Sequence, residues 1–211
     1  MAAQQQKQNY QRILEHTLEE IGKNGAVPTL LLHSCCAPCS SYVLEYLSQY
    51  FEITVFYYNP NIYPETEYRE RAREQERLIC EMKTENPIHF LEGTYDPSVF
   101  YAMAKGHEKD PEGGERCFRC YELRLREGAA AAKQGGFDYF TTTLSISPLK
   151  NAQKLNEKNM AFPTCSRTLK RRMAISVLPS FLPSTAFTAR TTAAVYFLSK
   201  GKINLKNSNL T

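Results

Sequence analysis

Short apolar segments alternate with longer amphipathic ones through the first two thirds of the chain, and this alternation constrains the fold more than any other feature. The pattern predicts strands over residues 29–34, 52–58, 88–91 and 137–143, and helices over residues 9–23, 42–47, 64–82 and 117–133. The first strand segment is almost wholly apolar, as in a buried parallel strand. The alternation therefore predicts a single Rossmann-like α/β domain, with a mostly parallel sheet and flanking helices.

The loops that follow the predicted strands are the expected place for a binding site. Ligands of open α/β sheets sit beyond the carboxyl ends of the strands. The loops at those ends span residues 34–40, 58–64, 92–97 and 143–148. The first of them contains Cys35, Cys36 and Cys39, so we expect these cysteines at the mouth of the site.

Cysteine usage points to metal or redox chemistry rather than to disulfides. The segment Met1–Lys7 lacks an apolar signal core, and no apolar run approaches the roughly 20 residues of a membrane span, so we expect a cytosolic protein. A reducing cytosol disfavours structural disulfides, and the chain has seven cysteines, an odd number. Clustered cysteines in that compartment more often bind metal.

Two cysteine groups have the spacing of metal ligands. Cys35, Cys36 and Cys39 follow the first strand, and Cys117 and Cys120 form a Cys-x-x-Cys at the start of a predicted helix, where the helix dipole favours thiolates. Adjacent cysteines share one tetrahedral zinc poorly, whereas an iron–sulfur cluster offers each a separate iron. The alternative is a zinc site at Cys117 and Cys120, with Cys35 and Cys36 as core thiols. We interpret the isolated Cys80 as a packed helix residue.

Several strings resemble the QueH epoxyqueuosine reductases, in the same order, over about residues 27–156. They are His33–Cys39, Tyr58–Pro64, Glu67–Tyr68, Arg116–Tyr121 and Thr142–Pro148. The resemblance implies an oxidoreductase that reduces the epoxide of epoxyqueuosine in the tRNA anticodon loop to queuosine, with electrons from an external donor. It also implies a [4Fe–4S] cluster held by Cys35, Cys36, Cys117 and Cys120. Cys39 is then a candidate for a second iron or for a role on the substrate side.

Other residues in and near these strings are candidates for further roles if the resemblance holds. Asn59 and Asn61 are candidates for hydrogen bonds to the nucleoside or for shaping the turn. Asp96 and His107 are candidate proton donors, and the hydroxyls of residues 141–147 are expected beside the cluster. Candidates for base stacking or core packing are Tyr57, Tyr58, Tyr63 and Tyr68. Candidates for phosphate contacts are Arg69, Arg71, Arg73, Arg116 and Arg119, the first three more plausibly on a solvated helix face.

The last quarter of the chain does not fit the family. Residues 1–150 carry 16 Lys/Arg and 21 Asp/Glu, whereas residues 151–211 carry 10 basic residues and one acid, Glu157. The family ends with a Tyr-Cys-Gly-Cys string whose cysteines form a redox pair, and this chain lacks it. We therefore divide the chain into a QueH-like domain, residues 1–156, and an aberrant, poorly ordered basic tail, residues 157–211.

Our hypothesis is that a reading-frame error near residue 157 produced the tail. For residues 173–198, each new codon is formed from the last base of one codon and the first two bases of the next. Codons that the amino-acid sequence permits then spell GYKRSTELSAEYGLYRKDYCGCVFS. The missing string reappears at the junctions within residues 191–195. The competing interpretation is a genuine basic tail that binds RNA.

Two other classes of protein compete with the reductase. A zinc-stabilised tRNA-binding module without catalysis fits the cysteines and the basic tail. An ATP-using tRNA thiolation enzyme of related architecture needs a glycine-rich phosphate loop after the first strand, and the segment Ser34–Pro38 contains no glycine.

Overall fold

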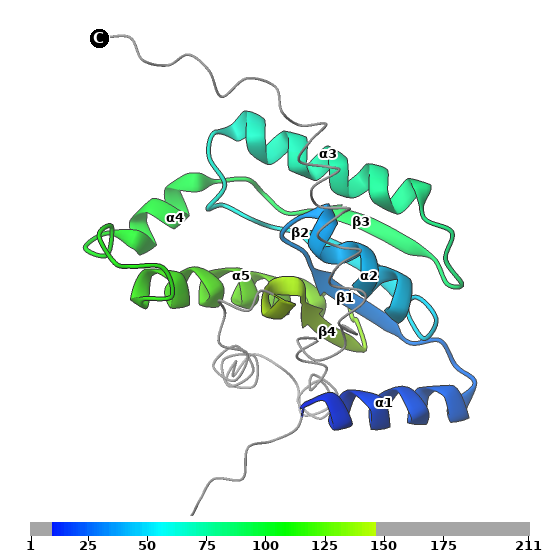
Figure 1. The fold of residues 1–211 in the computed structure, drawn as a ribbon. Helices are drawn as coiled ribbons and strands as arrows, with labels where there is room; N and C mark the ends of the chain where they lie inside the picture. The colour runs from blue at the N-terminus through cyan, green and yellow to red at the C-terminus, as the bar shows by residue number, and fades with distance from the viewer. Residues whose placement is uncertain (1–9, 147–211) are drawn as a thin grey trace, which may run out of the picture. The chain divides into compact units, whose positions relative to one another are not determined.

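A four-stranded sheet forms the centre of the protein, with the strands in the order β3-β2-β1-β4 (Figure 1). The computed structural model describes residues 10–146. The strands are β1 (Thr29–His33), β2 (Glu52–Tyr57), β3 (Ile88–Glu92) and β4 (Tyr139–Thr142). Each neighbouring pair is parallel. The predicted α/β fold with a parallel sheet is therefore confirmed.

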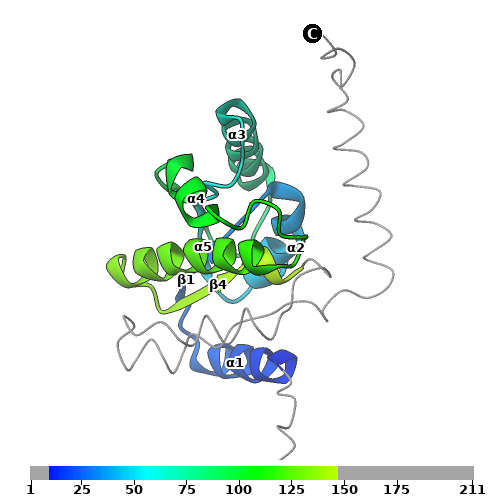
Figure 2. The same ribbon diagram turned by 90° about the vertical axis from the view of Figure 1, so that its left-hand side faces the viewer.

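Helices connect the strands. They are α1 (Tyr10–Asn24), α2 (Ala37–Leu47), α3 (Glu65–Glu81), α4 (Pro97–Ala104) and α5 (Glu115–Gln134), followed by a short 3-10 helix, η1 (Thr143–Ile146). Figure 2 shows α5 running alongside β1 and β4, with which it is in contact. Helix α4 also contacts α5, and α2 contacts α3. None of these helices is long and apolar enough to cross a membrane.

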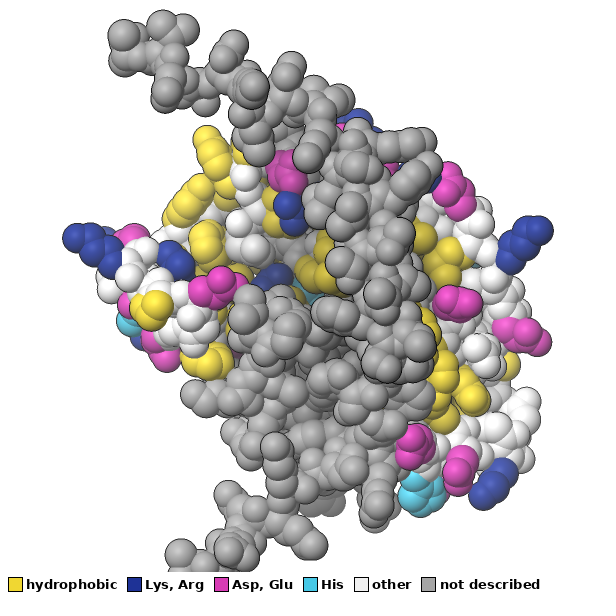
Figure 3. Space-filling view, in the orientation of Figure 1, with side chains coloured by type: hydrophobic (Ala, Val, Ile, Leu, Met, Phe, Trp, Pro, Cys, Tyr) yellow, Lys and Arg dark blue, Asp and Glu magenta, His cyan; other side chains and the backbone are white. Residues whose placement is uncertain are grey.

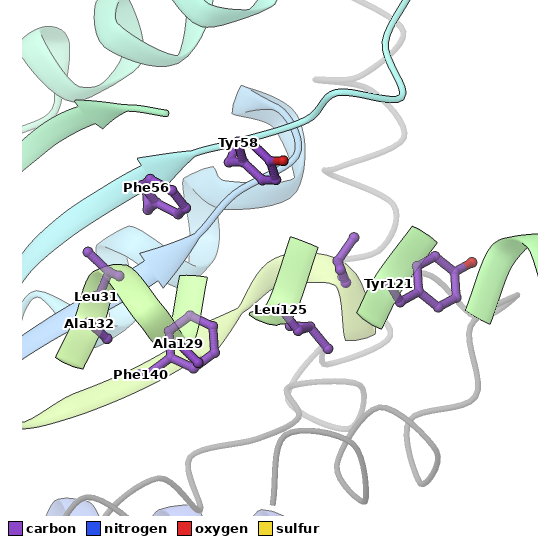
Figure 4. Close-up of a cluster of buried hydrophobic side chains, with 9 residues drawn as sticks. Leu31, Phe56, Tyr58, Tyr121, Leu125, Ala129, Ala132 and Phe140 are labelled. Atoms are coloured by element: carbon purple, nitrogen blue, oxygen red, sulfur yellow. The ribbon is translucent and has the colours of Figure 1, made fainter. Parts of the chain in front are cut away.

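Alternation of side chains along β2 gives the sheet two buried faces. Phe56 packs with Leu31 and Phe140 against α5, through Leu125 and other small or apolar side chains of that helix (Figure 4). The next residue, Tyr57, points the other way and packs with Tyr68 and Ala72 of α3. Three adjacent leucines of β1, residues 30–32, are fully buried, as expected for a central parallel strand.

Two helices differ from the sequence prediction. Helix α2 begins at Ala37, not at residue 42, because Cys36 takes the N-cap position and Pro38 fits the first turn. Helix α4 was not predicted at all. It is only 8 residues long, too short to show a clear period, although Asp96 and Pro97 are an ordinary N-cap and first-turn pair. The predicted tail, residues 157–211, lies outside the described residues.

Candidate metal centre

Three cysteine side chains converge where β1 ends and α2 begins. Cys35 and Cys36 lie in the connection, with their Sγ atoms 3.9 Å apart, and Cys39 lies in the first turn of α2. The sulfur atoms of all three lie within 4.8 Å of one another, and all three residues are half-buried. Sulfur atoms at this spacing are able to bind one metal ion.

The second cysteine pair lies at the N-terminus of α5. Gly114 takes the N-cap position, and the N–H of Gly113 donates to the Sγ of Cys117 at 3.4 Å. Gly113 has a φ of 81°, in the left-handed region that glycine adopts without strain. Cys120, one turn further along, is buried. Cys117 therefore lies in the first turn of α5, at a helix end whose free amides favour negative charge.

One cavity of about 390 Å³ brings the two cysteine groups together. Its wall contains Cys35, Cys36, Cys117 and Cys120, the four predicted ligands. Cys39 is not part of this wall, although its sulfur is close to those of Cys35 and Cys36. The remaining wall residues are Asn59, Asn61, Ile62, Arg71, Phe100, Arg116, Tyr121 and Arg124. The cavity therefore combines four thiols with three arginines, and no carboxylate is among its described wall residues.

The crowded thiols resist ionisation when no cation is present. The hydrogen bond between Cys36 and Cys35, together with burial, raises the pKa of Cys36 to about 11, against an opposing effect of the hydrogen bond with Cys39. Hydrogen bonds with Cys35 and Cys36, together with burial, raise the pKa of Cys39 as well. Thiolates this close repel one another, and a bound metal cation removes that penalty.

Buried polar contacts fix the cysteine loop in place. His33 is fully buried, with Nε2 3.0 Å from the carbonyl of Tyr58 and Nδ1 2.9 Å from the hydroxyl of Thr142. These partners fit a neutral imidazole that donates from Nε2 and accepts at Nδ1. Asn59 donates from Nδ2 to the carbonyl of Ser34 at 2.9 Å. The hydroxyl of Thr143 lies 3.4 Å from the amide nitrogen of Cys35 and 3.7 Å from its sulfur, so this predicted hydroxyl is beside the site.

Comparison with known proteins decides the family. The model of the family "Epoxyqueuosine reductase QueH" matches residues 30–170. The chain belongs to the QueH family. The match continues past residue 156, where we expected the likeness to end.

Curated relatives carry the same description. The epoxyqueuosine reductase QueH of Staphylococcus epidermidis is 45% identical over 159 residues, which is 74% of this chain and 67% of the relative. That of Streptococcus pyogenes is 44% identical over 154 residues, 72% of this chain and 60% of the relative. This QueH-family chain thus matches about two thirds of the length of these relatives. Among solved structures, an NH3-dependent NAD synthetase from Campylobacter jejuni has a TM-score of 0.45 at 11% identity, covering 93% of this chain and 80% of that one.

Three of the four tyrosines that were candidates for base stacking belong to the core and are not available for it. Tyr57 and Tyr68 are fully buried, and Tyr58 is 8% exposed. Tyr63 is 72% exposed, so it alone among the four is free to meet an RNA base. The sequence did not distinguish the buried tyrosines from the exposed one. Both faces of the sheet are covered, so neighbouring residues of a strand are buried alike and show no alternation.

The arginines divide only partly as the sequence indicated: the solvated position of Arg69 is confirmed, whereas Arg71, expected on the same face, also lines the cavity. Arg69 pairs with Glu65 and Glu92, and Arg119 pairs with Glu115, so these residues belong to the solvated face. In the uncovered part of Figure 3, basic and acidic side chains are likewise interspersed. Arg71 and Arg116 instead reach the cavity wall.

Neither candidate proton donor is in the described cavity wall. Asp96 caps α4 by accepting from the N–H of Ser98 at 2.9 Å. His107 contacts the carboxylate of Asp110 at 3.0 Å.

The interpretation of Cys80 as a packed helix residue was wrong, because Cys80 is exposed on α3.

Sequence reasoning missed Arg124, which is 4% exposed and lines the cavity. Cys117, Cys120 and Arg124 are at positions i, i+3 and i+7, which lie on one face of a helix. That spacing was the signal available in the sequence.

Proposed function

We propose that this chain is an epoxyqueuosine reductase, which reduces the epoxide of epoxyqueuosine in the tRNA anticodon loop and so forms queuosine. One observation carries the proposal: in a QueH-family chain, two cysteine pairs from separate elements line one cavity. Each pair follows from local sequence, but only folding places both at the carboxyl edge of the sheet.

The donor set fits an iron–sulfur cluster. Cys35, Cys36, Cys117 and Cys120 supply four thiol ligands, and the adjacent pair suits a group that offers separate iron atoms. Carboxylates, which hard cations such as Mg²⁺ require, are missing from the described wall. When bound, a [4Fe–4S] cluster supplies single electrons and a Lewis-acidic iron. Cys39 remains the candidate for a second iron or for a contact with substrate.

The reaction defines what the protein must provide. Conversion of the epoxide to an alkene breaks both C–O bonds, consumes two electrons and two protons, and releases the oxygen as water. The electrons come from an external donor, and the protons reach the oxygen from solvent or from a side chain.

Residues of the cavity wall have the chemistry to hold the substrate. The Oδ1 atom of Asn61 is buried and has no hydrogen-bond partner among the described residues. It is therefore placed to accept a hydrogen bond from a nucleoside hydroxyl or amine. The guanidinium of Arg116 donates to the backbone carbonyl of Glu108 at 2.7 Å and retains donors for a phosphate. Tyr63 offers an exposed ring for a neighbouring base.

Metal analysis tests the cofactor. The chain is reconstituted anaerobically with iron and sulfide, and both are quantified per chain. We expect about four irons and four sulfides. Serine at any of the four wall cysteines should lower both values, whereas Cys80→Ser, at an exposed position on α3, should leave them unchanged. Zinc without sulfide would instead favour the zinc-stabilised RNA-binding module.

A single-turnover assay tests the reaction. Protein reduced with dithionite is mixed with tRNA that carries epoxyqueuosine, and the nucleosides are analysed by mass spectrometry. We expect loss of one oxygen from the modified nucleoside with the wild-type chain and with Cys80→Ser. A fully loaded protein that leaves the epoxide intact would contradict the proposal.

A further inference from the structure

Arg124 is a buried cation in the wall of the cysteine cavity. It is 4% exposed, on the third turn of α5. Its Nε donates to the carbonyl of Cys120 at 3.4 Å, and one Nη donates to Oδ1 of Asn59 at 3.3 Å. The guanidinium carbon lies 5.6 Å from the centre of the Tyr121 ring. Every one of these contacts is with a neutral group.

No carboxylate neutralises Arg124 within residues 10–146. The other two arginines of the wall have partners at the surface: Arg71 pairs with Glu67 at 2.7 Å, and Arg116 is bound to the carbonyl of Glu108. A buried charge without a partner is strongly unfavourable, and proteins normally pair it. These neutral contacts therefore supply only part of the environment that a buried Arg124 requires.

The geometry of α5 aims Arg124 at the same space as the cysteines. Cys117, Cys120 and Arg124 share one helix face, and all three line the cavity. Asn59 fixes the guanidinium from the other side, since its side chain also holds the carbonyl of Ser34 next to Cys35. The arginine is thus anchored both to the helix that carries one cysteine pair and to the loop that carries the other.

We propose that Arg124 is the buried counter-charge of the thiolate-held metal centre, and that it makes this centre easier to reduce. This inference rests on the proposed function for the identity of the centre. Four thiolates outweigh the positive charge of the metal core, so the loaded centre is a net anion, and reduction makes it one unit more negative. Arg124 is a buried, fixed cation, so it stabilises the more negative, reduced form of the centre more than the oxidised form. Asn59 is a positioning residue, which acts on the centre by holding the guanidinium of Arg124 in place.

Redox titration of reconstituted full-length chains tests the role. The variants are Arg124→Met, which removes the charge, Arg124→Lys, which keeps it, and the control Arg126→Met, an exposed arginine on the same helix beside Glu127. We expect Arg124→Met to lower the ratio of reduced to oxidised centre at least tenfold. That change corresponds to a midpoint potential about 59 mV more negative for one electron. Arg124→Lys and Arg126→Met should stay near wild type.

The outcomes separate charge from packing. An unchanged potential in Arg124→Met with full iron and sulfide content overturns the proposal. If Arg124→Met assembles no cluster while Arg124→Lys does, the charge is required and the proposal stands. Loss of the cluster in both variants, with circular dichroism like that of wild type, would assign the role to the shape of the guanidinium and overturn it.

Failure of the proposed function gives a different result. In that case the wild-type chain itself contains no iron and sulfide. The same variants are then compared for Zn²⁺ affinity by competition with a chromophoric chelator, since a zinc–thiolate site is also anionic. Unchanged affinity in Arg124→Met would overturn the counter-charge role, and a loss of at least tenfold relative to Arg126→Met would support it.

Discussion

At Gly128 the backbone of α5 approaches Phe140 of β4 closely enough to exclude a side chain. A Cβ atom there would lie 2.7 Å from Cε2 and 2.8 Å from Cζ of the Phe140 ring. That ring is buried in the core between α5 and the sheet, so it has little room to move. We expect Gly128→Ala to destabilise the protein by about 1–3 kcal/mol in urea unfolding, despite the better helix propensity of alanine.

Gly22 provides the matched control for this substitution. It lies in α1, and a Cβ atom there would meet nothing within 4 Å. Gly22→Ala should raise the free energy of unfolding by up to about 1 kcal/mol, because only helix propensity changes. Equal effects at the two positions would contradict the close packing of α5 on β4.

At the scale of single elements, the N-cap of α4 separates a structural role from a catalytic one. Asp96 accepts from the N–H of Ser98, and asparagine caps a helix as well as aspartate does but cannot donate a carboxyl proton. We expect Asp96→Ala to cost about 1 kcal/mol of stability and Asp96→Asn to cost little. Asp96→Asn should also keep single-turnover reduction. If Asp96→Asn is as stable as wild type but does not reduce the epoxide, Asp96 is a proton donor and not only a helix cap.

The turn before α5 depends on an ionised carboxylate. The N–H of Arg116 donates to Oδ2 of Asp110 at 3.1 Å, and this bond, aided by His107, lowers the pKa of Asp110 below its ordinary 3.8. A lowered pKa means that the contribution of Asp110 to stability is complete above pH 3.8 and is lost as the pH falls through the lower folded-state value. Asp110→Asn should lack this acid-dependent loss.

Amide hydrogen exchange of residues 107–117 between pH 5 and pH 2, corrected for intrinsic rates, measures the effect. Wild-type protection should fall toward the acid end, while protection in Asp110→Asn should be lower at pH 5 and change less. Because Cys117 follows directly, the same turn orients a proposed ligand. Identical profiles for the two proteins would show that the carboxylate does not hold the turn.

At the scale of the whole molecule, we expect residues 157–211 to affect turnover rather than assembly of the metal centre. All four proposed ligands precede residue 157, so the chain as it stands should load a cluster. It lacks the Tyr-Cys-Gly-Cys string that the family resemblance associates with a redox pair. We expect a single turnover at most, and repeated turnover when residues 173–198 are replaced by the re-read segment that ends in this string.

Sequencing the gene across the codons for residues 150–172 is the direct control, and it covers the end of the family match at residue 170. A one-base insertion or deletion there supports the frame error. An intact frame would make the basic tail genuine, and salt-dependent tRNA affinity would then be its expected property. Equal multiple turnover by the original and the replaced chain would contradict the redox role of the string.

The sequence by itself determined the parallel α/β fold and the two cysteine pairs. The central strands are consecutive apolar residues, and the pairs stand at recognisable ends, Cys35 and Cys36 after the first strand and Cys117 at the start of α5. These are local signals, set by residues within a few positions of one another. The general rule for parallel sheets then predicts a site at the first pair, and the fold brings the second pair to the same cavity.

Only the tertiary structure decided which polar and aromatic side chains belong to the site. Arg124 and Asn59 are 65 positions apart, and nothing near either residue predicts their contact. Tyr57 and Tyr63 have the same chemistry, yet one is fully buried and the other 72% exposed. Their surroundings come from strands and helices distant in the chain. Burial depends on what the rest of the fold places over a residue, and no local pattern carries that information.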